Sequence, residues 1–173
     1  VLHYAQKFDG SQRARLQLSQ EELDGAARQL TPEFRAAVKT ASANIRAYAK
    51  LQLPAAKSKT IAPGLKVGQI VRPLDTVAAY IPAGRYPLPS TVLMTVIPAL
   101  AAGVPNVCVT SPRFVPEIMG TAALLKTPSV FQIGGAHAIA AFAFGTETVP
   151  RADRIVGPGN IYVAAAKKLL ADA

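Results

Sequence analysis

Apolar residues in the first third of the chain recur at helical spacing. Ser19 followed by Glu22 forms a capping-box pattern, which predicts a helix that begins near Gln20. Thr31 as cap and Pro32 at the first position predict the start of a second helix. Proline has no backbone N–H group, but the N–H group at the first helical position has no partner within the helix, so nothing is lost there. The second helix carries one apolar stripe, formed by Phe34, Val38, Ala41, Ile45 and Tyr48. We expect this stripe to pack against another part of the fold.

The spacing changes to that of a strand near residue 65. An Ala/Lys/Ser-rich stretch after Pro54 ends the second helix and predicts a loop. In residues 65–72, Val67, Gln69 and Val71 alternate with the other residues, which favours a strand near a sheet edge. Pro73 ends this strand, since proline cannot donate to a ladder.

After residue 75 the pattern becomes strand and helix in turn. Strands are predicted over residues 76–81, 106–110, 129–133 and 154–156, and helices over 90–102, 116–126, 136–144 and 160–171. Several strands are short and apolar on both faces, as in a parallel sheet covered by helices. We therefore predict an α/β fold: an incomplete Rossmann-like doubly wound parallel sheet in residues 75–173, preceded by a helical segment and an edge strand. Residues 1–74 then form part of a first domain.

Composition favours a globular protein with a buried core. Half of the 173 residues are hydrophobic, and the single cysteine, Cys108, lies in an apolar run where a buried filler is expected. One cysteine excludes an internal disulfide and suits a reducing compartment. No apolar stretch is long enough to span a bilayer and no charged leader precedes one, so we expect a soluble cytoplasmic protein with no membrane partner.

The net charge of +9 raises the question of nucleic acid. The basic residues are scattered, with one loose cluster at Lys50, Lys57, Lys59, Lys66 and Arg72. No aromatic residues interleave with them to form a stacking platform. We therefore expect no nucleic-acid partner.

Three glycine- or proline-rich turns are candidates for ligand binding. They come after predicted strands at residues 82–89, 134–135 and 157–159, where a parallel sheet gathers helix N-termini with unpaired N–H groups. Such groups can hold a pyrophosphate or an amide without a charged side chain. Each turn taken alone is more typical of a tight connection than of a site. The Gly-x-Gly-x-x-Gly fingerprint is absent, so these turns do not by themselves indicate NAD.

Four motifs, taken in order, carry a resemblance to a known family. They are Tyr80-Ile81-Pro82-Ala83-Gly84, Ser90-Thr91-Val92-Leu93-Met94, Gly134-Gly135-Ala136-His137-Ala138-Ile139-Ala140 and Gly157-Pro158-Gly159-Asn160. Two further segments join them, Tyr4-Ala5-Gln6-Lys7-Phe8-Asp9 and Gly145-Thr146-Glu147-Thr148-Val149-Pro150. Together they resemble histidinol dehydrogenase over nearly the whole chain.

The resemblance implies a dehydrogenase that oxidises an amino alcohol, L-histidinol, to an amino acid in two NAD-dependent steps with the help of zinc. It implies that Tyr80, His137 and Asn160 contact NAD, and that the full-length protein is a homodimer. His137 departs from the family, which usually has glutamine here. This histidine is either a tolerated change of hydrogen-bonding group or the mark of a paralogue that oxidises another alcohol.

Each of these residues also has an ordinary structural interpretation. Tyr80 can cover the core with its hydroxyl in water, and Asn160 can cap the last helix. Arg85, a cation beside the inferred site, is either a solvated loop residue or a partner for a phosphate or acid group. Asp153 and Glu147 are interpreted as surface or turn carboxylates.

The chain holds too few nitrogen and sulfur ligands for a zinc site. It has two histidines, His3 and His137, and one cysteine. The resemblance places the zinc ligands and the catalytic Glu-His pair beyond Ala173, so we expect no catalytic and no metal-binding residue here and no turnover by this chain alone. It also implies that sequence beyond Ala173 completes the first domain, to which residues 1–74 belong. A non-catalytic binding module remains an alternative to the enzyme.

Overall fold

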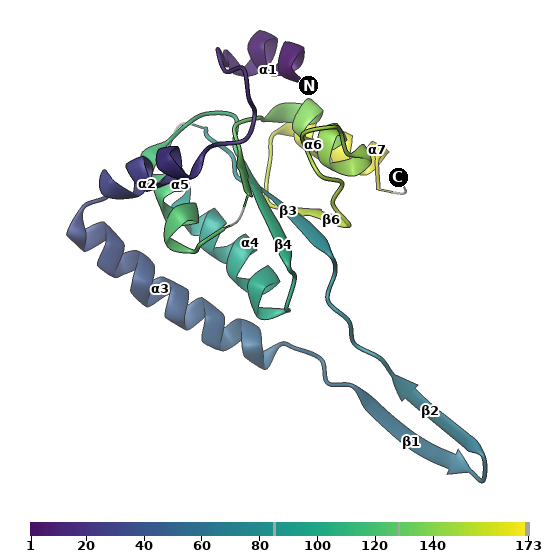
Figure 1. Cartoon of the computed structure of the whole chain (residues 1–173). Coiled ribbons are helices and arrows are strands. Elements are labelled where there is room, and N and C mark those ends of the chain that lie inside the picture. Colours follow the sequence, from purple (N-terminus) through teal and green to yellow (C-terminus); the bar gives the residue numbers. More distant parts are fainter. Residues whose placement is uncertain (85, 128, 172–173) are drawn as a thin grey trace.

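A four-stranded parallel sheet forms the centre of the protein (Figure 1). The computed structural model describes residues 1–84, 86–127 and 129–171. The strands are β3 (Thr76–Tyr80), β4 (Asn106–Thr110), β5 (Ser129–Phe131) and β6 (Arg154–Val156), in the spatial order β5-β4-β3-β6. Every neighbouring pair is parallel, which confirms the predicted sheet.

Helices cover both faces of the sheet, as a doubly wound fold requires. In β3, Val77 and Ala79 point into the core shared with α2 (Gln20–Arg28), α4 (Pro89–Ala101) and α5 (Pro116–Leu124). Ala78 and Tyr80 point to the opposite face, into the core shared with α6 (Gly135–Phe144) and α7 (Ile161–Leu169). The alternation results from the two-residue period of a strand, and it confirms the predicted fold class.

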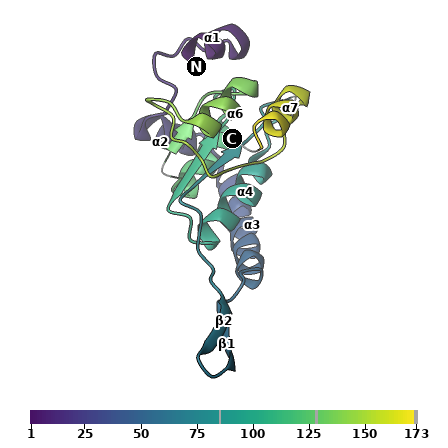
Figure 2. The same ribbon diagram turned by 90° about the vertical axis from the view of Figure 1, so that its right-hand side faces the viewer.

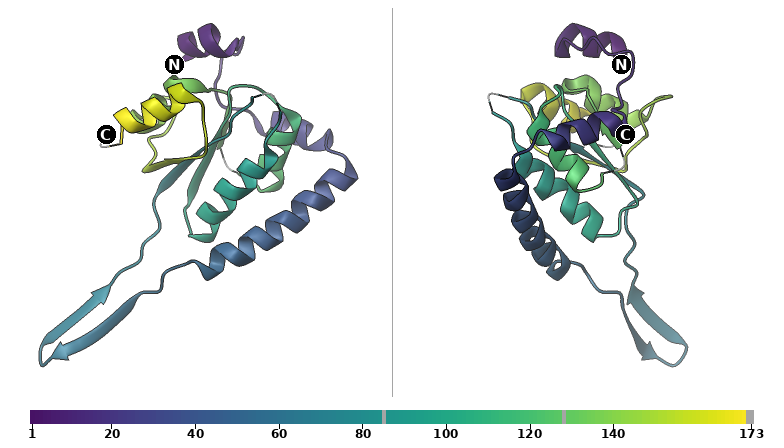
Figure 3. Two further views of the ribbon diagram at one scale, coloured as in Figure 1. Left: turned by 180° about the vertical axis from the view of Figure 1, so that it is seen from behind. Right: turned by 60° about the vertical axis from the view of Figure 1, so that its left-hand side comes forward.

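The two predicted helix starts in the first third are confirmed. Ser19 and Glu22 form a capping box at the start of α2, and Thr31 accepts a hydrogen bond from Phe34 N at the start of α3 (Pro32–Leu51). The apolar stripe of α3 packs on α4, where Val38 meets Leu93 and Ile97. Figure 3 shows the two helices side by side.

The stripe ends before Tyr48, which is 64% exposed. Because α2 joins the core of the sheet and α3 covers α4, the first third packs directly on the α/β part. A domain boundary at residue 74 stays a prediction.

The segment after α3 corrects one of the sequence predictions and supplies the partner of the predicted strand. Residues expected to form a loop are a strand, β1 (Lys57–Ala62), and the expected edge strand is β2 (Leu65–Gln69), which pairs antiparallel with β1 and not with the parallel sheet. This hairpin extends away from the rest of the molecule (Figures 1 and 2). Gly64, at φ 78°, makes the tight turn between the strands. The Pro63-Gly64 dipeptide was the overlooked turn signal.

Cys108 and Asp153 have the structural roles that their sequence context predicted. Cys108 is buried in the core, and burial raises the pKa of its thiol to about 11. Asp153 Oδ2 accepts hydrogen bonds from the backbone N–H groups of Asp75 and Thr76, each at 2.9 Å. These bonds fix the start of β3 beside β6. Among the described residues, no helix is long and apolar enough to cross a membrane.

The N-terminal end of α2 is stabilised by a charged network. Arg13 Nη1 and Nη2 donate to the two carboxylate oxygens of Glu22 at 2.6 and 2.9 Å, and Ser19 N donates to Glu22 Oε2 at 2.7 Å. Chiefly through the Arg13 hydrogen bond, the pKa of Glu22 is lowered from 4.5 to about 2.

We expect Glu22→Gln to lower the free energy of unfolding at pH 7 by about 1 kcal/mol, since it removes the ion pair and weakens the capping box. Because the folded pKa is depressed, the stabilisation is present above pH 4.5 and is lost as the pH falls toward 2. Urea titrations at several pH values measure this difference. Glu21→Gln, in the same exposed first turn, is the control and should cost less; equal losses in both variants would contradict the assignment.

Candidate functional site

The site lies where the direction of chain winding reverses. From β3 the chain proceeds to β4 and β5 on one side, and it then returns to β6 on the other side of β3. β3 leads into α4 on one face of the sheet and β6 leads into α7 on the other face, and open α/β sheets bind ligands at such a switch point.

Gly157 brings the turn after β6 against the end of β3. A Cβ atom on Gly157 would lie 2.1 Å from the carbonyl oxygen of Tyr80, and the φ angle of Gly157 is 103°. Only glycine satisfies both conditions. Lys167 Nζ donates to the Gly157 carbonyl at 2.6 Å, which ties the turn to α7, and burial lowers the pKa of Lys167.

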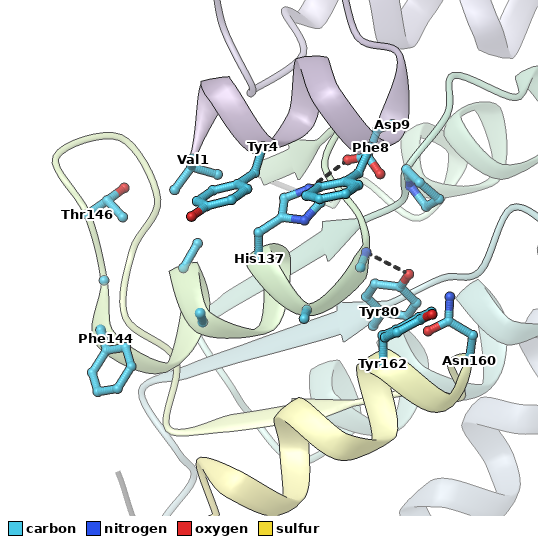
Figure 4. Close-up of a pocket in the computed structure, with 16 residues that line it drawn as sticks. Val1, Tyr4, Phe8, Asp9, Tyr80, His137, Phe144, Thr146, Asn160 and Tyr162 are labelled. Atoms are coloured by element: carbon cyan, nitrogen blue, oxygen red, sulfur yellow. Dashed lines mark hydrogen bonds and ion pairs between the residues drawn. The ribbon is translucent and has the colours of Figure 1, made fainter.

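A pocket of about 910 Å³ opens at this point, within the range of small-molecule and cofactor sites (Figure 4). Its walls come from α1 (Leu2–Asp9), the end of β3, one side of α6 over its whole length and the start of α7. Tyr80, His137 and Asn160, the three predicted cofactor contacts, all line it. The fold therefore brings together side chains that lie up to 80 positions apart in the sequence.

Tyr80 is buried, with 3% of its surface exposed, so its hydroxyl does not simply rest in bulk water. The hydroxyl oxygen accepts a hydrogen bond from Gly135 N at 3.1 Å. Burial raises the pKa of Tyr80, and the nearby negative charge of Asp9 raises this pKa further. Tyr80 therefore stays a phenol at neutral pH and keeps its own proton for donation to a ligand.

His137 is held by α1. Its Nε2 atom lies 2.9 Å from Asp9 Oδ2, and their side chains are 11% and 7% exposed. The rings of Tyr4 and Phe8, also on α1, lie over the His137 ring with centroid distances of 6.1 and 6.2 Å. Figure 4 shows these three rings gathered at one wall of the pocket.

The part that α1 plays in this site was missed by reasoning from the sequence. The segment from Tyr4 to Asp9 contributed only to the family resemblance, and no local pattern links Asp9 to a histidine 128 residues away. In the sequence, the local signal was the Asp9-Gly10 pair, a carboxylate followed by a glycine of the kind that ends helices.

Asn160 caps α7, as its alternative interpretation proposed. Its Oδ1 atom accepts a hydrogen bond from Val163 N at 3.0 Å. Capping uses the oxygen and leaves the amide N–H groups as donors on the pocket side, beside Tyr80 and Tyr162 (Figure 4). Capping and ligand contact are therefore compatible in this residue.

The turn at Gly134 and Gly135 differs from the cradle of free N–H groups that was expected. Gly134 N donates to Asp9 Oδ2 at 2.9 Å, and Gly135 N donates to the Tyr80 hydroxyl. Both amides are thus already hydrogen-bonded within the protein. In the loop after β3, the carbonyl oxygen of Ala83 accepts a hydrogen bond from Arg113 Nη2 at 2.6 Å. Arg85, in the same loop, lies outside the described residues.

A doubly wound parallel sheet with a pocket at its switch point places the chain among the Rossmann-like α/β proteins. The family model for histidinol dehydrogenase matches residues 1–173. The chain belongs to the histidinol dehydrogenase family, whose members are oxidoreductases of histidine biosynthesis.

Similar proteins support the assignment over the same stretch. The histidinol dehydrogenase of Methanothermobacter thermautotrophicus is 45% identical over 169 residues, which are 95% of this chain and 40% of that protein. That of Methanosarcina barkeri is 45% identical over 98% of this chain and 40% of its own length. The crystal structure of histidinol dehydrogenase from Elizabethkingia anophelis superposes with a TM-score of 0.93 at 35% identity, covering 98% of this chain and 40% of that chain. The chain thus spans about 40% of the length of these relatives.

Zinc does not fit the described residues. Within residues 1–84, 86–127 and 129–171, no group of three or more His, Cys, Asp or Glu side chains is placed to hold a metal ion. No step that uses zinc can be derived from these side chains.

We expect Gly157→Ala to lower the free energy of unfolding by about 2–4 kcal/mol, because the new methyl group meets the Tyr80 backbone and the φ angle is strained. Gly25→Ala is the control, since a Cβ there lies 3.8 Å from the nearest atom and alanine favours the helix. Thermal unfolding of both variants measures the contrast. Equal stability of Gly157→Ala and the parent would show that the turn after β6 does not lie against the end of β3 as described.

Proposed function

We propose that this chain forms the NAD-binding side of a histidinol dehydrogenase that oxidises L-histidinol to L-histidine. Membership of the family supports the reaction, and the convergence of Tyr80, His137 and Asn160 on one pocket carries the assignment of the cofactor side. NAD, when bound, supplies the acceptor for the hydride that leaves the alcohol carbon.

The pocket suits a dinucleotide in size and in the groups that it offers. Tyr80 donates from its hydroxyl and Asn160 from its amide, while His137 presents a ring nitrogen. The half-exposed rings of Tyr4 and Phe8 offer flat apolar surface against which a base or nicotinamide ring can lie. In this proposal these side chains bind and orient the cofactor.

The zinc ligands, the catalytic acid–base groups and most contacts to the amino alcohol belong, in this proposal, to the part of the relatives' length that the chain does not span. We accordingly propose that the chain binds NAD without turning over substrate. The homodimer and the cytoplasmic location inferred from the resemblance belong to the same proposal.

The histidine at position 137 does not favour a paralogue with another substrate. Its ring packs against α1 and faces Asp9, on the side of the pocket assigned to the cofactor. A change at this position alters how the dinucleotide is held rather than which alcohol is oxidised. L-Histidinol therefore remains the proposed substrate.

The reaction is tested with the full-length protein that contains this segment. Formation of NADH is followed by absorbance with L-histidinol, and with ethanol and a simple amino alcohol as comparison substrates. The proposal predicts turnover that depends on L-histidinol and NAD and is lost with a chelator. Turnover with another alcohol alone would point to the paralogue, and binding of NAD without any turnover would point to the binding module.

We expect Tyr80→Phe to weaken NAD binding roughly three- to tenfold, because it removes one hydrogen bond to the ligand and leaves Gly135 N without its acceptor. Isothermal titration of the chain with NAD measures the affinity. Tyr86→Phe is the control, since Tyr86 is 71% exposed and lies outside the pocket lining. An unchanged affinity in folded Tyr80→Phe would remove Tyr80 from the site.

A further inference from the structure

Asp9 connects three parts of the pocket through one carboxylate oxygen. Its Oδ2 atom accepts from Gly134 N at 2.9 Å and lies 2.9 Å from His137 Nε2. Asp9 belongs to α1, whereas Gly134 and His137 belong to the turn and first residues of α6. The carboxylate is 7% exposed, so little water competes for it.

This contact decides which hydrogen-bonding groups His137 offers to a ligand. A carboxylate accepts hydrogen bonds, so the Nε2 atom that faces it carries a proton. A neutral imidazole has one N–H, and its other nitrogen, Nδ1, is then an acceptor. In its neutral form His137 thus keeps one acceptor, Nδ1, which lies beside Gly135 in the wall of the pocket, whereas a glutamine offers a donor and an acceptor on the same side chain.

The same carboxylate also changes the character of the α6 N-terminus. Such a terminus usually attracts a phosphate through free N–H groups and the positive end of the helix dipole. Here Asp9 supplies the negative charge and occupies Gly134 N, and the Tyr80 hydroxyl occupies Gly135 N. A phosphate bound to Gly134 N or Gly135 N would have to displace these hydrogen bonds and would be repelled by Asp9.

We propose that Asp9 is a positioning residue: through Gly134 N and His137 Nε2 it makes this wall of the pocket a site for a ribose hydroxyl or a carboxamide, not for the pyrophosphate. The inference rests on the proposed function for the identity of the ligand. The position of the proton on the His137 ring, which the inference requires, is set within the chain and does not depend on a bound ligand.

The first test reads His137 directly in the absence of NAD. Long-range ¹H–¹⁵N spectra distinguish protonated from unprotonated ring nitrogens, and the chain has only His3 besides His137, so His137→Gln assigns the signals. We expect the parent to carry its proton on Nε2, with Nδ1 unprotonated at pH 8. In Asp9→Asn the negative charge is gone and the amide can face His137 with its oxygen or its NH2 group, so this preference should weaken, whereas Asp24→Asn, whose parent carboxylate accepts from Gln20 on α2, should leave it unchanged. A parent with the proton on Nδ1 would overturn the proposal.

The second test uses the parent chain and therefore does not depend on whether Asp9→Asn folds. Adenosine, nicotinamide riboside and inorganic pyrophosphate are titrated separately, and the amide shifts of residues 134–137 are recorded. We expect at least one nucleoside to move them and pyrophosphate at equal concentration to leave them in place. Shifts with pyrophosphate that match those with NAD would overturn the proposal.

Affinity for NAD separates this inference from the proposed function. Asp9→Asn should weaken NAD binding roughly tenfold while Asp24→Asn leaves it unchanged. If the parent does not bind NAD but His137 has its proton on Nε2, the proposed function fails and the role of Asp9 in setting the state of His137 stands. If NAD binds equally well to the parent and to folded Asp9→Asn, the positioning role fails and the proposed function stands.

Discussion

The contact between Gly157 and the end of β3 is the constraint on which the site depends. A backbone turn lies directly against the Tyr80 carbonyl, with no room for a side chain between them. This contact sets the position of Asn160 and α7 relative to Tyr80, while Asp153 holds the opposite end of β3 beside β6. The two strands at the switch point are thus fixed at both ends, and the pocket opens beyond their carboxyl ends.

The second constraint comes from the N-terminal helix. Asp9 joins α1 to the Gly134 turn, and the rings of Tyr4 and Phe8 pack over His137. The pocket is therefore built from the sheet on one side and from a helix more than 60 residues earlier than the sheet on the other. Each segment of such a site carries only a weak local signal in the sequence, because its polar groups find their hydrogen-bond partners in residues far away along the chain.

Much of the fold could be predicted from the sequence, since its signals are local. The capping box at Ser19, the proline at the start of α3 and the short apolar strands each reflect the backbone of a few residues. The β1–β2 hairpin was missed because its residues are exposed on both faces, so no hydrophobic alternation marks β1. The pairing of β2 with β1 left no mark either, as a register that buries nothing leaves no pattern in the sequence. The three predicted cofactor contacts came from the family resemblance, whereas the Asp9 contact depends on tertiary structure alone.

The central claim is that this chain holds the dinucleotide at the switch point between β3 and β6. The most direct test is a titration of the isotopically labelled chain with NAD, monitored by backbone amide shifts over all described residues. The account predicts saturable shifts at Tyr80, at residues 134–137 and at residues 157–160, with the β1–β2 hairpin unaffected. A folded chain whose shifts do not move at millimolar NAD, or move elsewhere, would contradict it.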